Sequence, residues 1–138
     1  MPDAAAIDAI DYIMSNYSQR NGVSEYGGWL YRLAGDVDPY TGEPFYSYTE
    51  PVAGTAKNIN SGIFNEPCEG NIKVAAYHSH PGDAYNVGKL SQDDYNWAAF
   101  HGAYSIYMGT PPGLLLGYYA NNFAARVRSV TWTVRHSY

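Results

Sequence analysis

The sequence predicts an α/β or α+β fold, a mixed β-sheet flanked by helices. Three observations indicate this class: an amphipathic helical pattern at 3–18, several short apolar runs of strand character, and a second helical pattern that begins at Ser91 between two of those runs. With 138 residues and no internal repeat, the chain is expected to form one domain, 1–138, whose motifs lie within 25–120.

The elements up to residue 70 follow from apolar spacing and turn residues. In the helix 3–18, apolar residues recur at intervals of three and four until an Asn-Gly pair ends the pattern. The stretch 25–33 has strand character, and a turn then leads to a short strand at 45–49, which predicts a hairpin. Residues 50–70 hold two prolines and three glycines without a clean period, so they are expected to be mostly loop with one short element.

The second half of the chain predicts the rest of the sheet. The apolar run 71–77 is typical of a central strand. After the helix that begins at Ser91, strands at 104–109 and 114–120 are joined by a Thr-Pro-Pro-Gly turn. The stretch 130–135 alternates apolar and polar residues, which predicts a last strand.

Composition excludes several classes of function. The net charge of −5 argues against binding to nucleic acid or to an anionic membrane surface. No apolar stretch is long enough to span a bilayer, and the first residues lack the basic charges of a secretory signal, so a soluble protein without membrane insertion is expected. Cys68 lies between two acidic residues, which disfavour the thiolate that a catalytic nucleophile needs.

Two histidines stand where the strand 71–77 meets a glycine-containing loop. Residues two apart in a strand point to the same face, so His78 and His80 can aim two imidazoles at one point. Neutral imidazole is a common zinc ligand. The alternative is that two polar residues simply cap a strand as it enters a loop.

An acid at the start of the next helix is a candidate third ligand. Ser91 and Asp94 form a Ser-x-x-Asp pattern, which is also the signature of a helix capping box. A catalytic zinc site needs three protein ligands and an open fourth position, and Asp94 is placed to supply the third. Asp93 and Asp83 are rivals for that role.

Glu25, at the head of the first strand, is the candidate general base. Zinc lowers the pKa of its bound water to roughly 7, and a nearby carboxylate then takes up and returns the proton. Two glycines follow at 27 and 28, where another backbone or a substrate can approach closely. The alternative for Glu25 is a solvated residue at a strand end.

These pieces together resemble the JAMM (JAB/MPN/Mov34) metalloenzyme motif, which has Glu on one strand, His-x-His-Pro on another, and Ser-x-x-Asp on the following helix. The wider sequence is similar to the JAB-like, toxin-associated domain of unknown function of Rhs-type bacterial polymorphic toxins. The blocks that carry this resemblance are Glu-Tyr-Gly-Gly-Trp-Leu-Tyr at 25–31, Tyr-His-Ser-His-Pro-Gly at 77–82, Leu-Ser-Gln-Asp-Asp at 90–94 and Tyr-Met-Gly-Thr-Pro-Pro-Gly at 107–113.

The resemblance implies a JAB/MPN-like fold, of cytidine-deaminase-like architecture, and a role for each motif residue. His78, His80 and Asp94 would bind Zn2+, Glu25 would be the general base, and Ser91 would stabilise the oxyanion. The loop between His80 and Ser91, ten residues long, is longer than the common JAMM spacing. A substrate cleft is expected to be lined by Gly27, Gly28, Gly109 and Thr110.

The function implied is a zinc-dependent peptidase or isopeptidase that hydrolyses an amide bond in a peptide or protein. It would serve as the toxic domain of an interbacterial effector, delivered by a secretion system, active in the cytoplasm of the producing or target bacterium, and neutralised by an immunity protein. Two alternatives remain open. One is a metal-free binding module on the same scaffold. The other is a metal-dependent toxin that acts on another substrate, such as cell-wall peptide.

Overall fold

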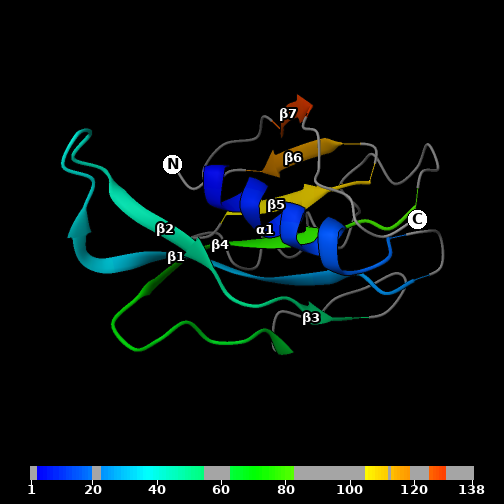
Figure 1. Cartoon of the computed structure of the whole chain (residues 1–138), viewed down its shortest axis with the longest axis horizontal. Coiled ribbons are helices and arrows are strands. Elements are labelled where there is room, and N and C mark those ends of the chain that lie inside the picture. Colours follow the sequence, from blue (N-terminus) through cyan, green and yellow to red (C-terminus); the bar gives the residue numbers. More distant parts are fainter. Residues whose placement is uncertain are drawn as a thin grey trace.

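A mixed sheet with a helix across one face organises the structure (Figure 1). The computed structural model describes residues 3–19, 23–54, 63–82, 105–111, 113–118 and 125–129. The elements within these ranges, in chain order, are α1 (Asp3–Asn16), β1 (Tyr26–Val37), β2 (Pro44–Tyr48), β3 (Val52–Ala53), β4 (Ile72–Ser79), β5 (Ser105–Gly109), β6 (Leu114–Tyr118) and β7 (Ala125–Ser129).

The order of the strands in the sheet is β2-β1-β4-β5-β6-β7, and the short β3 pairs with the start of β1 beside β2. The neighbours β4 and β5 are parallel, and every other described pair is antiparallel. The prediction of a mixed α/β or α+β fold is therefore confirmed. The parallel pair brings the carboxyl ends of β4 and β5 to the same edge of the sheet.

The helix α1 supplies most of the core on its face of the sheet. Its residues Ile10, Ile13 and Met14 are completely buried and pack, with the small Ala6 and Ala9, against strand residues that include Leu30, Ala75, Tyr77 and Tyr107. The apolar residues that recur at intervals of three and four in the sequence thus form the buried stripe of this helix. No helix in the described ranges is both long and apolar enough to cross a membrane.

A second, smaller cluster lies on the opposite face of the sheet. Trp29, Phe64, Ala76 and Ile106 form it. Trp29 is paired with Ala76, and Ala76 with Ile106, in adjacent strands. Because successive strand residues point to opposite faces, these three share the face away from α1. His78, two residues after Ala76, continues this second face.

Most predicted elements are confirmed: the first helix, the hairpin of β1 and β2, a short element in the loop that follows, and the strands β4, β5 and β6. Two strands run further than predicted, because Val37 pairs with Pro44 and Ser79 with Gly109. The strand β7 was not predicted and exists through its pairing with β6. The helix predicted from Ser91 and the strand predicted at 130–135 lie outside the described residues.

Candidate metal centre

The carboxyl end of β4 brings two imidazoles together. His78 lies in the strand, and His80 follows its last residue in line because the His80 N–H donates a 2.9 Å hydrogen bond to the carbonyl oxygen of Gly109. The extended chain therefore turns both side chains to the same face. Their Nε2 atoms lie 3.1 Å apart, and the ring planes meet at 64°.

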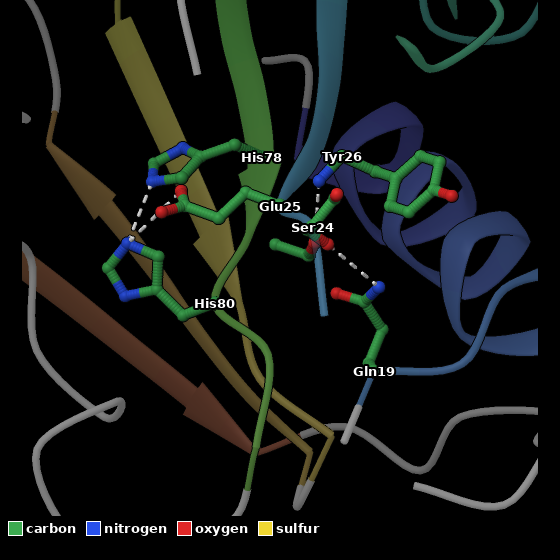
Figure 2. A network of polar contacts seen from close by, with 7 residues as sticks. Gln19, Ser24, Glu25, Tyr26, His78 and His80 are labelled. Carbon is green, nitrogen blue, oxygen red and sulfur yellow. Dashed lines mark hydrogen bonds and ion pairs between the residues drawn. The ribbon is translucent and has the colours of Figure 1, made fainter. Parts of the chain in front are cut away.

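Glu25 reaches the same point from the neighbouring strand. It directly precedes β1, whose Gly27 is the register partner of His78, and its carbonyl oxygen accepts a 2.7 Å hydrogen bond from the N–H of Gly54. The Glu25 Oε1 atom lies 4.0 Å from the His80 Nε2 atom. One ligand atom from each of the three side chains falls within 4.8 Å of the others, and Figure 2 shows the three pointing toward one another.

All three side chains are withdrawn from solvent. His78 is 2% exposed and Glu25 6% exposed, while the His80 side chain keeps 12% of its surface. The alternative that Glu25 is a solvated residue at a strand end is therefore wrong. A carboxylate buried to this extent requires compensation by hydrogen bonds or positive charge. A divalent cation among the three groups would supply that charge.

The distance between the two imidazoles fits a metal ion held by both histidines, with tetrahedral zinc as an example. Two nitrogen ligands of a tetrahedral zinc ion, each about 2.05 Å from the metal, stand about 3.3 Å apart. The 3.1 Å between the Nε2 atoms of His78 and His80 is close to that value. The Glu25 Oε1 atom, 4.0 Å from the His80 Nε2 atom, lies close enough to belong to the same group, so Glu25, His78 and His80 together could hold a metal ion.

The remaining predicted site residues are outside the described residues: the third ligand Asp94, its rivals Asp93 and Asp83, and Ser91, the residue expected to stabilise the oxyanion. The third ligand and the oxyanion donor therefore stay predictions. Cys68 is exposed and does not belong to the group formed by Glu25 and the two histidines.

The predicted cleft residues fall on both faces of the sheet. Gly27 pairs directly with His78 and so shares its face. Gly28 and Gly109 serve the α1 side, because a Cβ on Gly28 would meet the Thr49 Oγ1 atom at 2.6 Å and one on Gly109 would meet the Ile10 Cγ2 atom at 2.4 Å. Thr110, 2% exposed, directly follows β5 at the edge where His80 lies. A cleft lined by these residues stays a prediction.

Two buried polar side chains, absent from the sequence-based prediction, tie the strand ends together beside the site. The Ser79 Oγ atom accepts a 3.1 Å hydrogen bond from the N–H of Tyr26. The completely buried Gln19 donates from Nε2 to the carbonyl oxygens of Ser18, at 2.8 Å, and Ser24, at 3.5 Å. The main-chain carbonyl oxygen of Gln19 accepts a hydrogen bond from the N–H of Gly82. Gln19 thus joins the segment before Glu25 to the segment after His80. Figure 2 shows its bond to Ser24.

A signal for Ser79 was present in the sequence. A polar residue between two candidate ligands of one strand points to the opposite face, where it needs a partner when it is buried. Gln19 follows a helix near a loop and has no comparable pattern.

No family model matches the chain, and no curated protein or solved structure shows significant similarity to it.

Proposed function

We propose that the protein is a zinc-dependent hydrolase of JAMM type that cleaves an amide bond, as a peptidase or isopeptidase. The observation that carries the proposal is the buried convergence of the two imidazoles, with Nε2 atoms 3.1 Å apart, beside a carboxylate 4.0 Å from one of them. Perturbed or buried titratable groups gathered at one edge of a sheet are typical of catalytic sites. The motif order in the sequence supports the same proposal.

Each residue has a distinct task in this proposal. His78 and His80 hold the metal through Nε2, with Asp94 as the third ligand. Zinc at this position supplies a Lewis acid that polarises a carbonyl group and lowers the pKa of water. Glu25 takes a proton from the attacking water at a carboxylate oxygen and returns it to the leaving nitrogen. Ser91 donates a hydrogen bond to the oxygen that becomes negative in the transition state.

The substrate class proposed, a peptide or protein with an accessible amide bond, rests on the sequence resemblance. We further propose, from the sequence resemblance alone, that the chain acts as the toxic domain of an interbacterial effector and that an immunity protein neutralises it. The proposal is tested against two alternatives. One is a metal-free binding module on the same scaffold, and the other is a toxin directed at cell-wall peptide.

The experiment measures metal content and growth inhibition for the same set of variants. Wild type, Glu25→Gln and His80→Ala are purified for metal analysis after mild dialysis and expressed at matched levels in a bacterial host. Glu69→Gln is the matched control, since Glu69 is an exposed acid in a turn. We expect one zinc per chain in wild type, Glu25→Gln and the control, and its loss in His80→Ala. Growth inhibition should fall about 10²–10⁴-fold in Glu25→Gln, as is usual for loss of a general base.

The possible results separate the alternatives. Absence of zinc from the wild type would favour the metal-free binding module. Loss of zinc from Glu25→Gln would make Glu25 a ligand and overturn its role as base. Equal inhibition by all four proteins would mean that this site does not carry the function. Zinc-dependent inhibition with cleavage of isolated cell-wall peptides would identify the cell-wall alternative.

A further inference from the structure

Ser79 lies between the two histidines of the metal centre in the chain, but its side chain points to the opposite face of the sheet. It is the last residue of β4. It is completely buried, on the face opposite to the imidazoles. There its Oγ atom accepts the hydrogen bond from the N–H of Tyr26, the residue that directly follows Glu25.

This bond continues the pairing of two strands beyond the end of their ladder. The register of β1 and β4 ends with Gly27 opposite His78. At the next position, Tyr26 and Ser79 are joined by a side-chain hydrogen bond. On its other edge β4 stays paired with β5 up to Ser79 and Gly109.

The hydroxyl thereby acts on both halves of the site. It bonds the backbone N–H next to Glu25, and it ties Ser79, the residue between His78 and His80, to the β1 side. An extended residue 79 is what places the imidazoles on one face, because a local turn would send them apart. The N–H of His80 is bonded to Gly109, which fixes that residue from the β5 side only.

We propose that Ser79 is a positioning residue of the metal centre: its hydroxyl, bonded to Tyr26 N–H, sets the convergence of the His78 and His80 Nε2 atoms. The inference rests on the proposed zinc function. A hydrogen bond that only stabilised the fold would change the melting temperature and leave the zinc affinity of the folded protein unaltered. A positioning bond changes the zinc affinity as well.

The test compares zinc affinity and stability in three variants. Ser79→Ala removes one oxygen, Ser79→Thr restores a hydroxyl, and Ser47→Ala makes the same change in the edge strand β2 as a matched control. Zinc dissociation constants are measured by competition with a chelator of known affinity, and thermal unfolding is followed on the zinc-free proteins. Since loss of partners that orient metal ligands costs 10–100-fold in metal affinity, we expect Ser79→Ala to bind zinc about tenfold more weakly. Ser79→Thr should recover most of the loss, and Ser47→Ala should match the wild type.

The outcomes distinguish this inference from the proposed function. If wild type binds one zinc and folded Ser79→Ala binds it equally well, the inference fails while the metal centre stands. If Ser79→Thr is as weak as Ser79→Ala although both are folded without zinc, the hydroxyl is not the cause and the inference also fails. If wild type binds no zinc, the proposed function fails and takes this inference with it.

Discussion

Replacing Gly109 by alanine tests whether this glycine makes room for the packing of α1 or lines the predicted cleft. Its backbone does not have a positive φ, unlike Gly35 or Gly113, so alanine introduces no strain of the chain itself. The added Cβ would lie 2.4 Å from Ile10 Cγ2 and 3.1 Å from Ile10 Cγ1. Contacts this short force the α1 side chain to move, and overpacking of a well-filled core costs about 1–3 kcal/mol.

A double-mutant cycle with Ile10→Ala isolates that clash. Ile10→Ala alone removes buried methyl groups and should cost about 2–5 kcal/mol. In the Gly109→Ala background it also removes the two shortest contacts, and only the Ile10 Cβ remains, 3.2 Å from the new methyl group. We therefore expect a favourable coupling of at least about 1 kcal/mol between the two changes.

Urea unfolding of wild type, both single variants and the double variant, followed by aromatic fluorescence, measures the coupling. Gly35→Ala combined with Ile10→Ala is the control, since a Cβ on Gly35 would have nothing within 4 Å and its cost comes from a φ of 86°. That pair should be additive. If Gly109→Ala is as stable as the wild type, or if its effect on the free energy of unfolding is strictly additive with that of Ile10→Ala, the packing role is refuted. The predicted role of Gly109 in the cleft would then be favoured.

Two further predictions concern the third ligand and alkaline pH. In the helix predicted from Ser91, only one of two successive residues can face the histidines, and Asp94 holds the position of the Ser-x-x-Asp pattern. Asp94→Asn should therefore lose zinc while Asp93→Asn keeps it by metal analysis, and the opposite result would shift the predicted register by one residue. Burial, and secondarily Tyr48, raise the pKa of Tyr77 above its ordinary value of 10.0, so this phenol stabilises the folded state below pH 10 and that stability is lost as the pH rises beyond it. Urea unfolding at pH 9–11 should show a loss of up to about 1.4 kcal/mol per pH unit from this group. The slope should be shallower in Tyr77→Phe, and equal slopes would contradict the assignment.

Local pattern predicted much of the fold. The helix α1 carries apolar residues at intervals of three and four that mark its buried face, and the strands β4, β5 and β6 each carry a compact apolar run. The strand β7 was missed because its sequence, Ala-Arg-Val-Arg-Ser, is short and polar, and its pairing with β6 is a property of the sheet and not of the segment. Strand order and the parallel pairing of β4 with β5 likewise depend on contacts that no local pattern records.

Of the candidate site, the sequence predicted Glu25, His78 and His80, which the structure brings together, but not the surroundings of these residues. The His-x-His spacing at the end of an apolar run was enough to place two imidazoles on one face. The burial of Glu25 could not be predicted, because it depends on the pairing of β1 with both β3 and β4. The same holds for Gly28 and Gly109, whose missing side chains make room for partners far away in the sequence.

The hydrogen bond between Tyr26 and Ser79 joins residues 53 positions apart, and this separation has a consequence for folding. His78 and His80 are held with both imidazoles on one face only after β4 has paired with β1 and β5, so the unfolded chain offers the same His-Ser-His segment as a weak chelator without fixed geometry. A zinc ion would therefore bind the native state far more tightly than the unfolded chain. At a free concentration a hundredfold above its dissociation constant it would add about 2.7 kcal/mol to the free energy of unfolding. The supply of zinc would then affect the stability of the folded protein as well as its proposed activity.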